Sequence, residues 1–166
     1  MRRWRRLDVP GIEATPWSAE YLVTFDENWT TRSAEVSVAD ADRTRRLELR
    51  RDASGRWLAD GREVTACRGA FDVDLGLTPS TNTSAIRRLA LDVGQSADLV
   101  ATWVRFPDLD VQPLRQRYAR LSATEYTYES LRDGVVTFRA RLEVDAAGLV
   151  ERYLGLFERV EAPGPG

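Results

Sequence analysis

Apolar and polar side chains alternate without a break in VTFRARLEV, residues 136–144. Successive side chains of an extended strand point to opposite faces, so this stretch predicts a strand with one apolar and one charged face. Shorter alternations of the same period lie at 21–25, 35–38 and 46–50. Residues 99–106 are largely apolar at successive positions, as expected for a strand covered on both faces. The chain is therefore predicted to be mostly β.

Turn signals separate these stretches. Asp-x-x-Gly occurs at 52–55 and again at 145–148, each time after an alternating segment, and Asp-Gly occurs at 60–61 and 133–134. Glycine, and aspartate to a smaller extent, adopt the left-handed conformations that tight hairpins require. The spacing predicts antiparallel strands joined by short connections.

A single short helix is predicted within residues 79–89. Thr83 is expected to be its N-cap, and Arg87 and Arg88 favour its C-terminal end through the helix dipole. Around it we expect an N-terminal segment with an arginine-rich start at 1–18, a single domain at 19–160 and a disordered tail at 161–166.

Composition excludes several kinds of chemistry. The chain has 166 residues, 24 basic and 26 acidic side chains, and a formal net charge of -2, which argues against nucleic-acid binding. It contains neither histidine nor lysine, so a Ser-His-Asp triad, a His-ligated metal and a Schiff base are excluded. We expect no cofactor, and the lone Cys67 is expected to be a small buried residue.

The location is expected to be cytoplasmic. The arginine-rich start is not followed by the apolar stretch of an export signal, and no apolar run approaches the length of a membrane-spanning helix.

The densest polar cluster begins with two aspartates. If residues 71–75 form a strand, Asp72 and Asp74 share one face, about 7 Å apart. Such carboxylates can bind a hard cation or act as general acid and base. They can equally pair with arginines, for which Arg32, Arg87 and Arg88 are candidates.

Aromatic residues form a second candidate surface. Tyr126 and Tyr128 lie on one face of a predicted strand, and Trp29 lies near another. Aromatic rings with a polar handle suit a cavity for an amphiphilic ligand, although such residues are also common in an ordinary core.

Together these motifs resemble the putative glycolipid-binding family, a bacterial domain. The segments that carry the resemblance cover about residues 20–160, and they are DENWTTR at 26–32, WLADG at 57–61, DVDLGLTPSTNTSAIRRL at 72–89, QRY at 116–118, YTYES at 126–130 and VDAAGLV at 144–150.

The resemblance implies a many-stranded antiparallel sheet curled into a spiral β-roll around a single short helix, similar to bacterial lipoprotein carriers and found as a homodimer. The function it suggests is glycolipid binding, with an apolar cavity for acyl chains and a polar rim for the headgroup. The residues proposed for ligand binding are Asp72, Asp74, Asn82, Arg87, Arg32, Trp29, Tyr126 and Tyr128.

Two other functions stay open at this point. A small enzyme that processes a sugar or lipid ester would use Asp72 and Asp74, with arginine stabilising negative charge. A dimeric interaction protein would bind no ligand at all. The resemblance transfers no catalytic residue and no metal ligand, so the binding protein is preferred to the enzyme.

Overall fold

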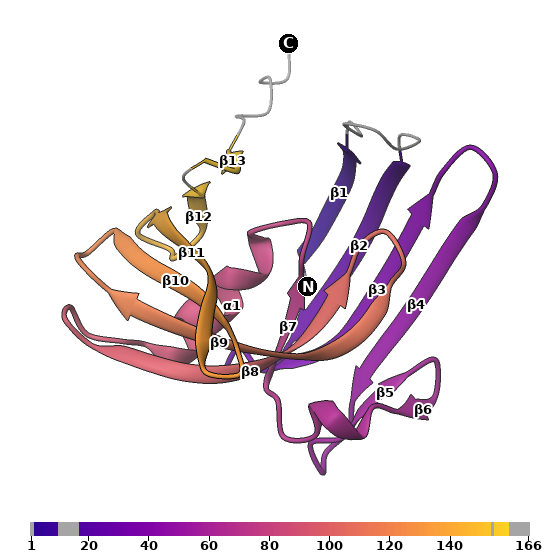
Figure 1. Cartoon of the computed structure of the whole chain (residues 1–166), viewed down its shortest axis with the longest axis horizontal. Coiled ribbons are helices and arrows are strands. Elements are labelled where there is room, and N and C mark those ends of the chain that lie inside the picture. Colours follow the sequence, from indigo (N-terminus) through magenta and orange to yellow (C-terminus); the bar gives the residue numbers. More distant parts are fainter. Residues whose placement is uncertain (1, 10–16, 154, 160–166) are drawn as a thin grey trace. The chain divides into compact units, whose positions relative to one another are not determined.

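Most of the residues that the structure describes lie in strands, and few lie in helices. The structure, a computed structural model, describes residues 2–9, 17–153 and 155–159. Its strands form a six-stranded and a seven-stranded sheet, and the seven-stranded sheet is curled into a half-barrel (Figure 1). With α1 (Ser80–Leu89) as the one α-helix among the described residues, the predicted mostly β fold with a curled sheet is confirmed.

The six-stranded sheet follows the order of the chain. Its members are β1 (Arg2–Val9), β2 (Trp17–Phe25), β3 (Thr31–Ala39), β4 (Thr44–Arg51), β5 (Trp57–Ala59) and β6 (Arg62–Glu63), and each pairs antiparallel with the next. The seven-stranded sheet contains β7 (Asp72–Leu75), β8 (Ser96–Arg105), β9 (Asp110–Arg120), β10 (Glu125–Arg132), β11 (Val135–Val144), β12 (Val150–Tyr153) and β13 (Phe157–Glu158).

The chain divides into two compact units. Unit 1 is Met1–Leu77 with Val100–Leu114, and unit 2 is Thr78–Leu99 with Arg115–Gly166. Strands β8 and β9 run through both units. Each unit has its own buried apolar cluster.

Unit 1 buries the alternating apolar side chains of β2, β3 and β4. Val36, Val38 and Leu49 are almost fully buried, as the alternation predicts. The 3-10 helix η1 (Thr65–Cys67) follows β6 and ends at Cys67, which is 0% exposed, so the expected burial of this cysteine is confirmed. Burial also raises the pKa of the Cys67 thiol.

Unit 2 packs α1 against one face of its strands. Ala85 and Ile86 of the helix join the cluster that contains Tyr118, Tyr128 and Leu142. Because Tyr118 and Tyr128 are paired across β9 and β10, the apolar face of these strands is the face that carries the helix.

Three features differ from the sequence analysis. The helix begins at Ser80 after Pro79, and Thr83 lies buried inside it, so the prediction of Thr83 as N-cap is wrong. Residues 2–9 form β1 and pair with β2, although this arginine-rich stretch shows no regular alternation of apolar and polar residues. Strand β7 pairs with β8 in parallel rather than antiparallel, because α1 and its flanking loops return the chain to the same end of the sheet. The predicted tail at 161–166 lies outside the described residues.

Candidate functional site

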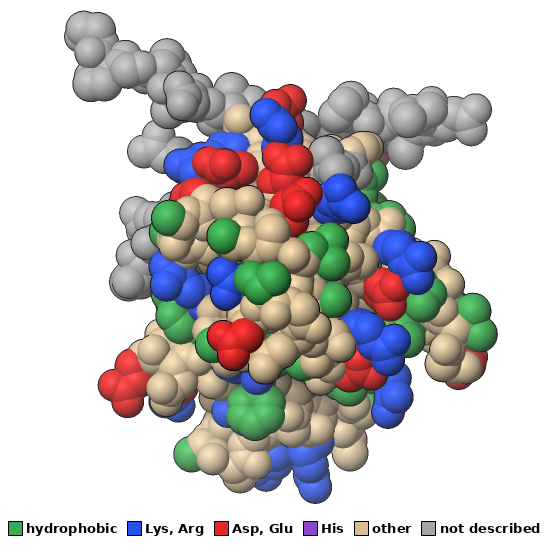
Figure 2. All heavy atoms as spheres, turned by 90° about the vertical axis from the view of Figure 1, so that its left-hand side faces the viewer, with side chains coloured by type: hydrophobic (Ala, Val, Ile, Leu, Met, Phe, Trp, Pro, Cys, Tyr) green, Lys and Arg blue, Asp and Glu red, His purple; other side chains and the backbone are tan. Residues whose placement is uncertain are grey.

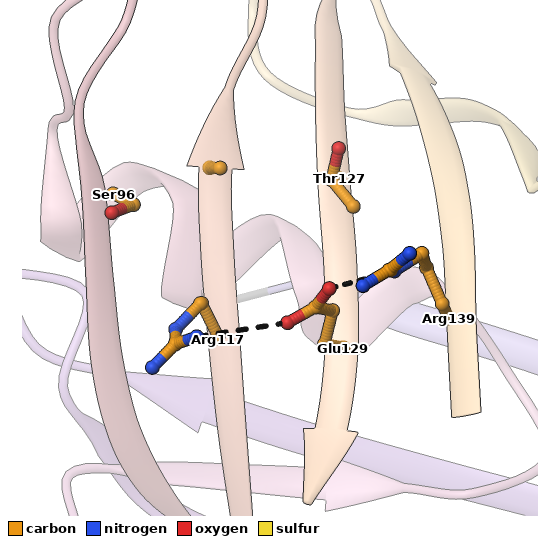
Figure 3. A pocket seen from close by; sticks show the side chains of 6 residues that line it. Ser96, Arg117, Thr127, Glu129 and Arg139 are labelled. Carbon is orange, nitrogen blue, oxygen red and sulfur yellow. Dashed lines mark hydrogen bonds and ion pairs between the residues drawn. The ribbon is translucent and has the colours of Figure 1, made fainter. Parts of the chain in front are cut away.

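A pocket of about 360 Å³ lies over strands β8 to β11 of unit 2 (Figure 3). This volume is within the range of small-molecule sites. The side chains that line it are mostly polar: Ser96, Arg117, Ala119, Thr127, Glu129 and Arg139.

Strand alternation places these side chains opposite the helix. On β9, Arg117 and Ala119 flank the buried Tyr118, and on β10, Thr127 and Glu129 flank the buried Tyr128. The tyrosines belong to the core that includes α1, so the pocket residues lie on the other face of the same strands.

The strand register brings three charged residues into one row. Glu129 is directly opposite Arg117 on β9 and directly opposite Arg139 on β11. Glu129 Oε1 accepts a hydrogen bond from Arg139 Nε at 2.7 Å, and its Oε2 lies 4.0 Å from Arg117 Nη1. On the side away from Glu129, the Arg117 guanidinium donates two hydrogen bonds to Asp98 of β8, at 2.6 and 3.0 Å. We call Asp98, Arg117, Glu129 and Arg139 the charge ladder.

The members of the charge ladder alternate in sign across four strands. The hydrogen bonds from Arg117 lower the pKa of the Asp98 carboxyl, and the same bonds raise the pKa of Arg117. Both groups are therefore charged at neutral pH. Glu129 is 8% exposed, whereas the side chains of Arg117 and Arg139 are 45% and 66% exposed. The buried carboxylate is thus fixed between two guanidinium groups that still reach solvent.

This arrangement offers both hydrogen-bond acceptors and donors. A carboxylate oxygen accepts from several groups at once, and a guanidinium has five N–H donors, so each can bind a ligand hydroxyl while it keeps its ion pair. The hydroxyls of Ser96 and Thr127 add groups that can donate or accept. In the described part of the chain, no three His, Cys, Asp or Glu side chains are grouped as a metal site requires.

Comparison with known proteins gives the family. The family model described as putative glycolipid-binding matches residues 12–159, nearly the whole chain. The chain belongs to the putative glycolipid-binding family. It is similar to the crystal structure of a DUF1089 family protein from Pseudomonas aeruginosa, with 38% sequence identity and a TM-score of 0.85 over 93% of this chain and 84% of that one. None of the curated proteins matches the sequence.

Four of the residues predicted for ligand binding in this family member lie in unit 1. Asp72 is 1% exposed and Asp74 half-buried, on the strand β7 that was expected for them. The Arg32 guanidinium lies 3.4 Å from the carboxylate of Asp26. The Trp29 ring packs beside Phe25, with ring centroids 5.9 Å apart.

The other four predicted residues lie in unit 2, on or beside the face that carries the helix. Asn82 Nδ2 donates to Tyr118 Oη at 2.8 Å inside the core. Tyr126 and Tyr128 are each 4% exposed and share one face of β10, as predicted. The Arg87 side chain lies over Gly148, in the second Asp-x-x-Gly turn. None of these four lines the pocket over the charge ladder.

The pocket residues were not predicted from the sequence, and for Glu129 and Arg139 the reason is a β-bulge. From the Asp133-Gly134 turn, a regular register would place Glu129 opposite Phe138. The bulge between Ser130 and Leu131 shifts the pairing by one residue, which brings Glu129 opposite Arg139. The charged residues of β10 and β11 were visible in the sequence, but their cross-strand partners were not.

Proposed function

We propose that this protein binds an amphiphile with a hydroxyl-rich headgroup, as a glycolipid-binding protein, and that the pocket over the charge ladder takes the headgroup. The observation that carries the proposal is a pocket of about 360 Å³ whose charged side chains are already fixed by one another. Side chains that are held in place before binding lose less conformational entropy when a ligand arrives. The family description supports the same ligand class.

Sugar hydroxyls suit this lining because each one both donates and accepts. A hydroxyl near the centre of the pocket would donate to the Glu129 carboxylate and accept from an N–H of Arg117 or Arg139. Such hydrogen bonds fix the orientation of the headgroup more than they add affinity, since water is displaced from the same groups.

The apolar part of the ligand would begin at the next cross-strand row after Glu129, on the same face of the sheet. Leu131 follows Glu129 by two residues on β10, so it points to the same side, and it is paired with Val136 on β11 and with Arg115 on β9. Val136 is 37% exposed. Each methylene group that these side chains remove from water would contribute about 0.8 kcal/mol.

The experiment titrates octyl β-D-glucoside, below its critical micelle concentration, into the protein. Binding is monitored by the chemical shifts of the backbone amides in NMR spectra. We expect shifts centred on β9, β10 and β11 around the charge ladder. Ala119→Phe fills the pocket and should weaken binding at least about tenfold. Ala123→Phe, at an exposed loop position of the same unit, is the matched control and should bind like the wild type.

A different pattern would overturn this assignment. Shifts that are absent, or that survive Ala119→Phe, would show that the pocket is not the headgroup site. The rim predicted from the sequence is a separate arm of the same experiment. It predicts shifts at Asp74 and Asn82, and a loss of binding in Asp74→Asn that the pocket proposal does not predict.

The proposal keeps the cytoplasm as the location, which the sequence predicts, and a homodimer as the assembly, which the family resemblance implies. Among the helices of the described ranges, none has the length and apolar character to cross a membrane. Cell fractionation and sedimentation velocity test the two expectations directly. Native mass spectrometry of protein purified from its own host would identify a lipid that copurifies.

A further inference from the structure

Glu129 occupies the centre of the pocket, and its charge is the least exposed of those that line it. Its side chain is 11% exposed, against 45% for Arg117 and 66% for Arg139. Strand register holds it between the two arginines, opposite both. A ligand that enters the pocket therefore meets the guanidinium groups and this carboxylate together.

The charges of the ladder cancel. Asp98 and Glu129 carry two negative charges, and Arg117 and Arg139 carry two positive charges. On the same face, Arg141 Nη1 lies 3.5 Å from Glu125 Oε1, which forms a further pair of opposite charges. Arg115, at the edge of the ladder, adds a positive charge that helps to lower the pKa of Asp98. On the face shown in Figure 2, basic and acidic side chains are likewise interspersed.

We infer that Glu129 determines the class of headgroup that the pocket accepts: a neutral polyol is bound, and a phosphate or carboxylate is rejected. This inference rests on the proposed function, because it concerns the same pocket. Two arginines alone would form an attractive anion site, since guanidinium groups bind phosphate in a bidentate manner. The Glu129 carboxylate occupies that position and repels a second anion, and its burial reduces the screening of this repulsion by solvent.

The experiment compares two probes that share one alkyl chain, octyl β-D-glucoside and octyl phosphate, both below their critical micelle concentrations. The wild type should bind the glucoside more tightly. Glu129→Gln keeps the size of the side chain and its hydrogen-bonding oxygen, but leaves the ladder with one excess positive charge. We expect it to bind octyl phosphate about fivefold more tightly than the wild type does, and the glucoside more weakly. Glu125→Gln neutralises another glutamate of β10 outside the pocket and should leave both affinities unchanged.

Arg139→Gln tests the opposite sign and covers the case in which Glu129→Gln does not fold. This side chain is 66% exposed, so its loss should leave the fold intact. The ladder then carries one excess negative charge, and octyltrimethylammonium should bind more tightly than it does to the wild type.

The outcomes separate the two proposals. A wild type that binds neither octyl glucoside nor octyl phosphate would overturn the proposed function. Glucoside binding at the pocket, combined with unchanged selectivity in both Glu129→Gln and Arg139→Gln, would overturn the role of Glu129 alone. A wild type that prefers octyl phosphate would overturn that role as well.

Discussion

The buried clusters of the two units are built from different side chains. In unit 1 the cluster is mainly valine, leucine and alanine, with Trp57 as its largest member and Tyr21 as its one tyrosine. In unit 2 the cluster includes four tyrosines, Tyr118, Tyr126, Tyr128 and Tyr153. The first kind of core depends on filled volume, whereas the second also depends on the partners of its polar atoms.

The helix strengthens this contrast. Four successive polar residues of α1 are buried in unit 2: Thr81, Asn82, Thr83 and Ser84. Buried polar groups are costly unless they are hydrogen-bonded, so unit 2 has to meet more geometric conditions than unit 1. The same unit carries the pocket on the other face of its strands. Predictions for single substitutions follow from this difference.

The largest effect is expected from Trp57→Ala in unit 1. Trp57 is 0% exposed, and its indole N–H donates to the carbonyl oxygen of Ala70 at 3.0 Å. Removal of the ring leaves a cavity and should lower the free energy of unfolding by about 3–5 kcal/mol, measured by urea denaturation. Trp57→Phe is the control and should cost less, because its ring fills most of the space that Trp57→Ala leaves empty. In both variants the Ala70 carbonyl oxygen keeps the hydrogen bond from Arg51 Nε. A cost below about 1 kcal/mol for Trp57→Ala would contradict a volume-dependent core.

Tyr118→Phe should have the next largest effect, although it removes a single atom. The ring and its edge contact with Tyr128 remain, with ring centroids 5.3 Å apart. The buried Asn82 Nδ2 loses its acceptor, which should cost about 1–3 kcal/mol. A double-mutant cycle with Asn82→Leu isolates the interaction. Additive effects of the two substitutions would show that the hydrogen bond does not stabilise unit 2.

The elements that the sequence predicted well are those with local causes. The alternation at 138–144 corresponds to the larger part of β11, whereas the bulge places Val136 on the charged face, so its predicted position on the apolar face is wrong. The Asp133-Gly134 turn has the positive φ values, 52° and 77°, that a tight hairpin requires. The burial of Tyr126 and Tyr128 on one face follows from the same period of two. Neighbouring residues decide each of these features, so one sequence was enough.

The features that escaped prediction depend on distant residues. The start of the chain, RRWRRLDV, has no simple alternation, and β1 is defined by its pairing with β2. The parallel pairing of β7 with β8 depends on the connection through α1. The Glu129–Arg139 pair of the charge ladder requires the bulge at Thr137, whose hydroxyl donates to the carbonyl oxygen of Ser130. A shift of one residue changes every cross-strand partner beyond it, and the alternation pattern does not reveal such a shift.

The two Asp-x-x-Gly turns allow a smaller test of the comparison between units. In unit 1 the Asp52 carboxylate accepts hydrogen bonds from the Ser54 hydroxyl at 2.7 Å and from the Arg56 backbone at 3.0 Å, and these bonds hold the pKa of Asp52 well below its usual range. In unit 2 the corresponding position is Ala147. Ser54→Ala makes the first turn read DAAG, as at 145–148, and should raise the pKa of Asp52 toward its ordinary value.

The sign of the pH dependence follows from the depressed pKa. A carboxyl whose pKa is lower in the folded state stabilises the fold above about pH 4, and this contribution is lost as the pH falls through the folded-state value. Ser54→Ala should therefore be less stable than the wild type near neutral pH, with the difference shrinking in acid. Carbon-detected NMR titration of Asp52 and unfolding at several pH values measure both effects. An unchanged Asp52 titration would show that the Ser54 hydroxyl does not lower its pKa.

The smallest effect on stability is expected for Arg139→Gln, which is also one of the two substitutions proposed to change ligand selectivity. Arg139 is 66% exposed, and the 11% exposed Glu129 keeps Arg117 as a second cationic neighbour when Arg139 is removed. A long exposed side chain also loses entropy when it is held in an ion pair, so the loss of this pair should cost little. Arg139→Gln should therefore cost about 0.2–1 kcal/mol, and the cost should shrink as salt is raised. Arg141 lies on the same strand as Arg139 and pairs with Glu125 of β10. Arg141→Gln is the matched comparison and should cost a similar amount. A cost well above about 2 kcal/mol for Arg139→Gln alone would mean that the charge ladder is needed to hold the sheet together. Binding data on its variants would then report a change in the fold, and the ladder would resemble the core of unit 2 rather than a site built for a ligand.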